Sequence, residues 1–356
     1  MPDRVAHLGE KIRELNLEAF VISSLTNLRY LTGFTGSNAI AVFTQSNIFL
    51  ITDKRYREQA DAEAQNAEVI ICAKNLYQPI KDHKLFKQCK RIAFEACHLS
   101  FRAFSHLQKI AEKVQFVATE NLIEKITATK EPEEIEKISN ACDTCAKLWQ
   151  HILPMLCVGM AELDIAAEIA YQAHKHGADG VAFEPIVASG WRAALPHGKA
   201  SPKKIQKGEL VVVDFGCEVG GFKSDVTRTI AFGEPTHEQQ QVYGAVKDAN
   251  AFAFESIIPN MKAVDLDKAV RDRLIAAGYQ EQFSHSLGHG LGLGIHELPR
   301  IGENSKDSIP PFSVFTIEPG VYIPGFGGVR IEDDVVVTKS GPKLLSKIDR
   351  DLSVIE

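Results

Sequence analysis

The sequence has no block of basic residues and no long apolar run near its start. Its 356 residues carry a formal net charge of −6, so neither a nucleic-acid partner nor an anionic membrane surface is expected. Residues 1–18 contain charges throughout, which argues against a signal peptide or a membrane span there. We expect a cytoplasmic protein that acts on small molecules.

The sequence also lacks a disulfide framework. Its seven cysteines are an odd number, scattered over a large chain, which is typical of reduced thiols. Cys142 and Cys145 form a C-x-x-C pair, but no second pair or nearby histidine completes a zinc site. We interpret both as buried positions of a helix.

Three catalytic signatures are absent. Leu298, Pro299 and Arg300 follow His296-Glu297, so the HExxH zinc motif is missing, and no G-x-S-x-G serine motif occurs. The glycine-rich run SHSLGHGLGLGIHELPR does not match G-x-G-x-x-G, so a phosphate loop is excluded. Its glycines instead permit a bulge or bend that brings its histidines to one place.

Hydrophobic patterns predict two domains, which suits a chain of this length with 45% apolar residues. In the stretch ITATKEPEEIEKI, Pro132 suits the first turn of a helix, and the glutamates that follow it suit a helix N-terminus. We therefore expect a new domain to begin there. We expect an α/β domain at 1–125 and an α+β domain at 126–356. The predicted strands of the first domain are 19–24, 39–44, 48–53, 68–73, 91–96 and 114–119, after a helix at 5–16; the predicted long helices of the second are 131–152, 161–176, 236–258 and 264–277.

Two acidic residues flank a predicted hairpin. If Gly220-Gly221 is its two-residue turn, residue i faces residue 441 − i. Asp225 then lies opposite Gly216, as a diagonal neighbour of Asp214 on the same face. For this pair alone, exposed hairpin carboxylates remain an equal alternative.

A second acidic pair favours a shared site over exposed hairpin carboxylates. Glu318 and Glu332 are symmetric about Gly325, so a hairpin folded there brings them together. Four gathered carboxylates repel by about 4 kcal/mol per pair at 4 Å and an effective dielectric of about 20. With one imidazole added, they make a site for two hard or borderline divalent cations.

Five local motifs carry a family resemblance: DFG, SDVTRT, GHGLG, TIEPG and VRIED. In this order they resemble the dinuclear metallopeptidases of the pita-bread fold, in the proline-specific branch of prolidase and aminopeptidase P. The match runs from about residue 131 to 352. TNLRYLTGFTGSNA resembles the creatinase-like N-terminal domain of that branch. The resemblance implies an α/β creatinase-like domain followed by an α+β pita-bread catalytic domain.

The resemblance also implies a ligand set. Two divalent ions are expected, Mn²⁺ or Co²⁺ in first place and Zn²⁺ as an alternative. Glu318 is expected to accept the proton of a metal-bridged water, and the resulting hydroxide to attack the peptide carbonyl. The implied metal ligands are Asp214, Asp225, His289, Glu318 and Glu332.

Other residues receive roles from the same resemblance. His296 and His197 match positions that contact the reacting peptide, and His285 matches one lining the proline pocket. Arg330 matches a catalytic arginine beside the last ligand. Outside this context, His197 and His285 are ordinary loop and core histidines. Arg300 is either a partner for a substrate C-terminal carboxylate or part of a surface salt bridge.

The resulting hypothesis is metal-dependent hydrolysis of Xaa-Pro bonds in short peptides by a homodimer. Whether the enzyme is a dipeptidase or an aminopeptidase stays open, because the sequence does not show whether the cleft is closed beyond the proline. One alternative is a creatinase-type hydrolase, which needs no metals and departs from this ligand pattern. The other is a non-enzymatic pita-bread binding protein, a kind that loses ligands or carries basic insertions.

Overall fold

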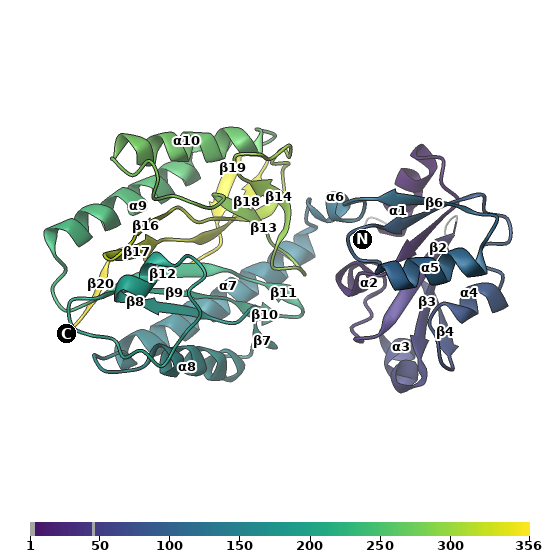
Figure 1. The fold of residues 1–356 in the computed structure, drawn as a ribbon, viewed down its shortest axis with the longest axis horizontal. Helices are drawn as coiled ribbons and strands as arrows, with labels where there is room; N and C mark the ends of the chain where they lie inside the picture. Colours follow the sequence, from purple (N-terminus) through teal and green to yellow (C-terminus); the bar gives the residue numbers. More distant parts are fainter. Residues whose placement is uncertain (1–3, 45–46) are drawn as a thin grey trace. The chain divides into compact units, whose positions relative to one another are not determined.

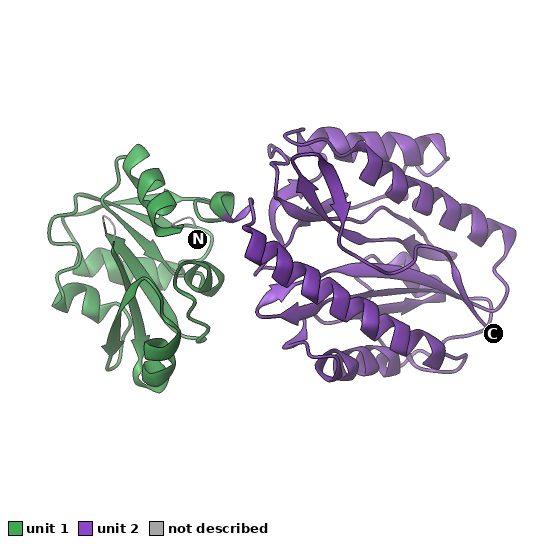
Figure 2. Cartoon of the chain, turned by 180° about the vertical axis from the view of Figure 1, so that it is seen from behind, with its two compact units in different colours: residues 1–126 green, residues 127–356 purple. Residues whose placement is uncertain are grey.

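The computed structural model describes residues 4–44 and 47–356 (Figure 1). The chain forms two compact units, Met1–Ile126 and Thr127–Glu356 (Figure 2). The boundary between the two units, after Ile126, lies one residue beyond the expected one. Among the described helices, none combines the length and apolar character needed to cross a membrane.

Unit 1 is built on one six-stranded sheet, in the order β4-β3-β2-β1-β5-β6. β2 and β3 form the predicted antiparallel hairpin with Thr44 opposite Asn47; the turn residues Gln45 and Ser46 lie outside the described residues. The strands are β1 Ala19–Ile22, β2 Ala39–Thr44, β3 Asn47–Asp53, β4 Ala67–Cys72, β5 Arg91–Glu95 and β6 Gln115–Thr119; the helices are α1 Arg4–Glu14, α2 Leu25–Thr32, α3 Arg57–Glu63, α4 Gln78–Asp82, α5 Phe101–Ile110 and α6 Glu124–Thr127, with the 3₁₀ turn η1 Lys54–Tyr56. The predicted α/β unit is confirmed.

Unit 2 places long helices on both sides of its strands, as Figure 1 shows. The helices α7 Pro132–Ile152 and α8 Glu162–Lys175 lie on one side; α9 His237–Ser256 and α10 Ala263–Ala276 lie on the other. α7 begins as expected at Pro132, where the Glu131 N–H donates to the Glu134 carboxylate at 2.9 Å. All four long helices were predicted to within two residues at either end.

Two larger sheets carry the strands of unit 2, in the orders β20-β12-β9-β8 and β14-β13-β15-β18-β19. Two smaller sheets have the orders β11-β10-β7 and β16-β17. The bounds are β7 Gly180–Val181, β8 Ile186–Ser189, β9 Leu210–Phe215, β10 Cys217–Val219, β11 Phe222–Lys223, β12 Val226–Phe232, β13 Gly288–Gly290, β14 Glu297–Ile301, β15 Val314–Ile317, β16 Gly320–Ile323, β17 Gly327–Arg330, β18 Asp333–Thr338, β19 Gly341–Leu344 and β20 Ser353–Ile355, with 3₁₀ turns η2 Leu153–Met155 and η3 Gly190–Ala194.

Both predicted hairpin registers are confirmed. Val219 pairs with Phe222, and the same register continues along β9 and β12 to Phe215 and Val226. In the second hairpin Gly320 pairs with Arg330, and the register continues along β15 and β18. Each hairpin differs from the expectation in one way, because the strand pair next to its turn and the strand pair farther from it belong to different sheets.

Cys142 and Cys145 are buried on α7, as interpreted from the sequence. The Cys142 thiol donates to Asp334 Oδ2 at 3.2 Å, and Cys145 Sγ lies 3.1 Å from Ser224 Oγ. Burial and the Asp334 charge raise the pKa of Cys142 well above its ordinary value. Both thiols therefore stay protonated and serve as packing and hydrogen-bonding groups.

Candidate metal centre

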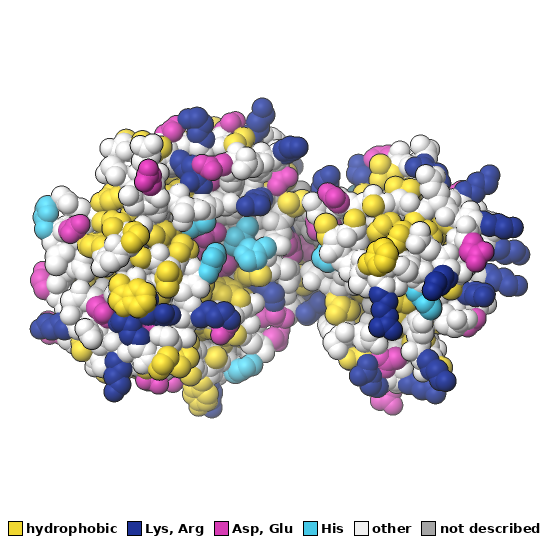
Figure 3. All heavy atoms as spheres, in the orientation of Figure 1, with side chains coloured by type: hydrophobic (Ala, Val, Ile, Leu, Met, Phe, Trp, Pro, Cys, Tyr) yellow, Lys and Arg dark blue, Asp and Glu magenta, His cyan; other side chains and the backbone are white. Residues whose placement is uncertain are grey.

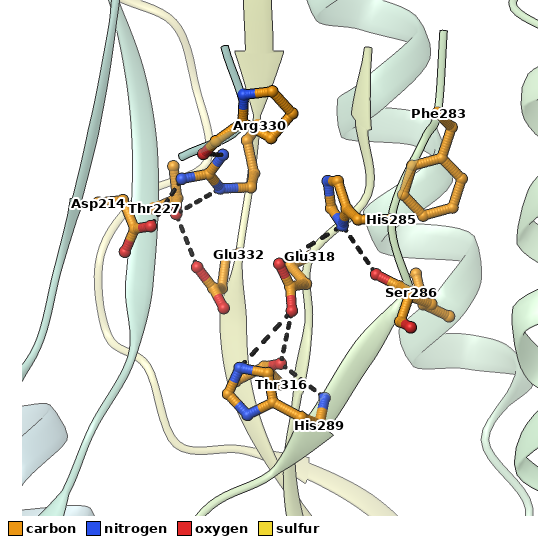
Figure 4. Close-up of polar contacts among 12 residues, drawn as sticks. Asp214, Thr227, Phe283, His285, Ser286, His289, Thr316, Glu318, Arg330 and Glu332 are labelled. Atoms are coloured by element: carbon orange, nitrogen blue, oxygen red, sulfur yellow. Dashed lines mark hydrogen bonds and ion pairs between the residues drawn. The ribbon is translucent and has the colours of Figure 1, made fainter. Parts of the chain in front are cut away.

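The acidic residues meet where the two larger sheets of unit 2 touch. Thr227 on β12 pairs with Asp214 on β9 and also forms a bridge to Glu332, which precedes β18. Thr227 Oγ1 donates to Glu332 Oε2 at 2.6 Å. Figure 4 shows Thr227 between Glu332 and Arg330, and Arg330 in turn reaches Asp214 of the first hairpin.

The structure brings all five predicted ligands to one place. Ligand atoms of Asp225, His289 and Glu332 lie within 4.8 Å of one another. His289 Nε2 is 3.5 Å from Asp225 Oδ2 and 3.7 Å from Glu318 Oε1. The carboxyl groups of Asp214 and Asp225 lie close enough for each to affect the pKa of the other.

Two oxygens of this cluster have no protein partner among the described residues. They are Oδ1 of Asp214 and Oδ1 of Asp225, and both are buried. A buried carboxylate oxygen without a hydrogen bond is costly, whereas oxygen is the ligand that hard divalent cations prefer. The donor set therefore fits divalent metal.

Electrostatics favours the same conclusion. Burial, followed by Glu332 and Asp214, raises the pKa of Asp225 well above its ordinary value. Burial also raises the pKa of Glu332 well above normal and that of Glu318 to about 8. Burial raises the pKa of Asp214 even though Arg330 opposes the shift. Without bound cations, these carboxyl groups cannot all ionise together.

His289 is prepared to act as a neutral ligand. Burial and the neighbouring His296 lower its pKa to about 4. Its Nδ1–H donates to the Gly290 carbonyl at 3.1 Å, so the lone pair of Nε2 faces Asp225. This backbone hydrogen bond fixes the tautomer that a metal-binding histidine needs.

The glycine-rich run forms a hairpin rather than one bent strand. β13 pairs antiparallel with β14, and the register shifts between His289 and Gly290, which is the predicted bulge. The rings of His289 and His296 lie 4.3 Å apart at 67°. Burial lowers the pKa of His296 and Asp214 raises it, so His296 lies beside the acidic centre.

Glycine at 288 and 290 is required by close backbone contacts. A Cβ on Gly288 would lie 1.8 Å from the Thr316 carbonyl oxygen, and one on Gly290 would lie 2.1 Å from that of Leu298. Both contacts are impossible for any other residue without moving the main chain. The glycines thus allow β13 to pack closely between its neighbours.

His197 is exposed and follows η3. When charged it lowers the pKa of both Asp214 and His296, so it lies within electrostatic reach of the centre. Figure 3 shows a group of histidine side chains at the surface of unit 2, with acidic side chains beside them. The exposed position leaves His197 accessible to a ligand.

Glu162 was not among the residues predicted for the site. Fully buried at the start of α8, it accepts from Ser189 N at 2.7 Å and from Ser201 Oγ at 2.6 Å. It also binds Arg192 Nε at 3.0 Å. These contacts hold both ends of the loop that carries His197. A glutamate in a first helical turn is too common to have signalled this role.

His285 and Tyr322 form a second polar group beside Glu318. His285 Nδ1–H donates to the Ser286 carbonyl at 2.8 Å, so Nε2 accepts from the Tyr322 hydroxyl at 2.8 Å. Burial lowers the pKa of His285 to about 3, which keeps the ring neutral. Tyr322 was not predicted, because Glu318 and Tyr322 do not lie on one continuous strand whose spacing could have linked them.

Arg330 is buried within the centre. Its Nη2 donates to Asp214 Oδ2 at 2.6 Å, Nε to Thr227 Oγ1 at 3.0 Å, and Nη1 to the Tyr322 hydroxyl at 2.9 Å. Neighbouring Tyr322 and Asp214 raise its pKa well above the ordinary value, although burial opposes the shift. It is a permanent cation that orients the Asp214 carboxylate.

Arg300 lies at the edge of a pocket of about 250 Å³ that Arg271, His285 and Glu303 also line. Its guanidinium contacts Ser286 Oγ at 3.4 Å. Within residues 4–44 and 47–356 it forms no ion pair, so the surface salt bridge weighed from the sequence is absent. The guanidinium is available to an external anion.

The largely buried cluster of four carboxylates and one neutral imidazole, with two oxygens that have no partner among the described residues, is the donor set of a divalent-metal site. Residues 136–339 match metallopeptidase family M24, and residues 4–127 match the creatinase/prolidase N-terminal domain. The chain belongs to metallopeptidase family M24. It is a peptidase, and its fold is the expected creatinase-like domain followed by a pita-bread catalytic domain.

Similar proteins cover the whole length. An uncharacterized peptidase YqhT of Bacillus subtilis is 37% identical, over 97% of this chain and 99% of its own. The structure of a Xaa-Pro dipeptidase from Bacillus anthracis has a TM-score of 0.95 at 33% identity, with 99% of both chains covered. An X-Pro aminopeptidase structure from Thermotoga maritima has a TM-score of 0.89 at 35% identity, covering 97% of this chain and 100% of its own.

Proposed function

We propose that this protein hydrolyses the Xaa-Pro bond of short peptides. The observation that carries the proposal is the largely buried set of four carboxylates and one neutral imidazole in a chain of family M24. The names of the similar Bacillus anthracis and Thermotoga maritima proteins support the proline preference. The ligands would be Asp214, Asp225, His289, Glu318 and Glu332.

The proposed cofactor is a pair of divalent cations, Mn²⁺ or Co²⁺ in first place and Zn²⁺ as an alternative. When bound, such ions polarise the peptide carbonyl and make water acidic enough to act as a nucleophile near neutral pH. The oxygen-rich set, with a single nitrogen, supports hard and borderline ions over soft ones.

The chain's own groups have separable tasks. Glu318, whose pKa is raised to about 8, would hold the proton removed from the attacking water. His296 and His197 would donate to the developing oxyanion or protonate the leaving proline nitrogen. Arg330 would keep Asp214 ionised and oriented. His285, held by Tyr322, would border the proline ring.

Arg300 helps to distinguish a dipeptidase from an aminopeptidase, because the two kinds of substrate differ in the group that follows the proline ring. A dipeptide presents its carboxylate on the proline itself, whereas a longer peptide has an amide there. A guanidinium without an ion-pair partner, beside His285 in the same pocket, supports recognition of that carboxylate. We therefore favour the dipeptidase, with the aminopeptidase as the second candidate because of the similar Thermotoga maritima structure.

The proposal extends to a cytoplasmic homodimer. The described cysteines are all free, which supports a reducing compartment. Light scattering after gel filtration would measure the mass of the assembly in solution. A mass of 39.2 kDa, that of one chain, would refute the dimer.

The central test is a peptide series on metal-free protein reconstituted with Mn²⁺ or Co²⁺. Xaa-Pro, Xaa-Pro-Yaa and Xaa-Ala peptides are compared, with Asp225→Asn as the ligand variant. We expect cleavage of Xaa-Pro, little cleavage of Xaa-Ala, and loss of both activity and metal content in the variant. No cleavage of any proline peptide, or an unimpaired Asp225→Asn, would refute the function.

Metal analysis separates the two alternatives. About two ions per chain support the peptidase, whereas a chain without metal supports a binding protein or a creatinase-type hydrolase. The complete ligand set makes both alternatives the weaker explanation.

A further inference from the structure

The turn between β13 and β14 closes around the carboxylate of Glu297. Glu297 Oε1 accepts from the Gly294 N–H at 2.7 Å, and Oε2 accepts from Lys130 Nζ at 2.8 Å. The side chain of Lys130 is 2% exposed and that of Glu297 is 10% exposed. The turn therefore encloses a nearly buried ion pair.

Gly292 and Gly294 leave space for this carboxylate. A Cβ on Gly292 would lie 2.5 Å from Glu297 Oε2, and one on Gly294 would lie 3.2 Å from Glu297 Cγ. Neither glycine has a positive φ, so backbone conformation does not require it. The second half of the glycine-rich run is explained by Glu297, not by metal or substrate.

Lys130 is itself held firmly. Its Nζ also donates to the Thr127 carbonyl at 2.6 Å, and its backbone N–H donates to the Phe312 carbonyl at 2.8 Å. Removing one member of such a buried pair leaves the other charge uncompensated. The ammonium group is thus a fixed anchor for the Glu297 carboxylate.

The enclosed turn carries His296. Glu297 follows it directly, and Glu297 pairs with Gly290, the residue after His289, where β13 and β14 run side by side. The His296 ring in turn lies against the His289 ring, with 4.3 Å between centroids. A shift of Glu297 would move both sides of this contact.

We propose that Lys130 and Glu297 are a positioning pair that holds the turn bearing His296 against the His289 ring. This inference rests on the proposed function only in taking His296 as a group that contacts substrate. Glu297 does not reach the reacting atoms, because both its oxygens are engaged by Lys130 and the Gly294 amide.

The test compares Lys130→Met, Glu297→Gln and the double variant with Val270→Ala. Val270 is fully buried on α10. It belongs to a different core cluster from Leu291, Leu293 and Ile295 of the turn, so its truncation lowers stability without removing a core contact of the turn. Hydrogen exchange of residues 291–297 is measured in metal-free protein. kcat, KM and the pH profile of kcat/KM are then measured after reconstitution with Mn²⁺.

We expect faster exchange of the Gly294 amide and a fall in kcat of roughly tenfold in each single variant, with KM little changed. The double variant should lose no more than the worse single variant, because the pair acts as a unit. Val270→Ala should change neither the exchange of the turn nor the pH profile.

Unchanged exchange in Glu297→Gln, which preserves shape and folds most readily, would overturn the proposal. So would faster exchange with unchanged kcat, or an equal loss of kcat in Val270→Ala. The exchange measurement needs no substrate, so it stands even if the wild type cleaves no proline peptide.

Discussion

Arg330 donates to Asp214 across 2.6 Å, and both side chains are buried. The same guanidinium holds Thr227, whose hydroxyl donates to Glu332. One arginine thus stabilises a carboxylate from each of the two hairpins. It opposes the rise that burial causes in the pKa of Asp214, and so favours the ionised form that binds a cation.

Replacing Arg330 should weaken metal binding. Arg330→Met removes the charge that lowers the pKa of Asp214 through a direct hydrogen bond, so we expect metal affinity to fall by roughly 10–100-fold. Arg330→Lys keeps the charge but cannot contact Asp214, Thr227 and Tyr322 at once. Its metal affinity should therefore lie between that of the wild type and that of Arg330→Met. Calorimetric titration with Mn²⁺ measures both. Unchanged affinity in Arg330→Met would contradict the orienting role.

The metal-free protein should lose stability as pH rises from 6.5 to 8. The pKa of Glu318 is raised to about 8 in the folded state, so only the unfolded chain ionises this group in that window. The pKa values of His285 and His289 are lowered from 6.5 to about 3 and about 4. These two groups make the protein more stable as pH rises, but only below pH 6.5, so they do not offset the loss expected between pH 6.5 and 8. The expected loss from Glu318 is about 2 kcal/mol.

The free energy of unfolding, measured with denaturant at several pH values, shows whether stability falls or rises with pH. Mn²⁺ should abolish the loss because cations displace the retained protons, and proton release on binding should be visible in buffers of different ionisation enthalpy. Glu318→Gln without metal should show a smaller loss between pH 6.5 and 8. A metal-free protein that becomes more stable over that range would disprove the assignment.

Glu162 should control the loop that carries His197. Glu162→Gln keeps the shape but removes the charge that holds Ser189, Ser201 and Arg192. We expect the free energy of unfolding to fall by about 1–3 kcal/mol and trypsin cleavage at Lys199 to accelerate. Glu168→Gln on the same helix is the control and should change neither. Equal cleavage rates in both variants would rule out a specific hold on the loop.

Arg300 should recognise the carboxylate of a dipeptide. Arg300→Leu is expected to raise KM for Xaa-Pro by roughly tenfold or more, because a charge-assisted hydrogen bond is lost. With an amidated Xaa-Pro substrate, wild type and variant should differ little. Arg273→Leu, at a surface pair with Asp248, is the control. An equal KM increase on both substrates would point to a general defect of the pocket instead.

The hairpin registers could be predicted because strand geometry is periodic. Glycine turns fix which residues face each other, so the Asp214–Asp225 and Glu318–Glu332 relationships followed from counting. The division of each hairpin between two sheets did not follow from counting. In the second hairpin it falls between β15 and β16 on one side. Pro319 separates β15 from β16 and cannot donate to a continuous ladder, which explains the break once it is seen.

Contacts between distant segments were out of reach. Lys130 and Glu297 are 167 residues apart, and no periodicity links them. Glu162 likewise binds residues 27 and 39 positions away. Such partners depend on how helices and sheets pack, which a single sequence encodes only through its whole fold.

The bridge between Thr227 and Glu332 gives the centre a further property. Each hairpin contributes half of the acidic residues, and neither half has a full ligand set. A bound cation would therefore cross-link the two hairpins, which come from separate parts of the chain. Fragments severed within the α9–α10 connection, each with one acidic pair, would rejoin more tightly with divalent metal than without it.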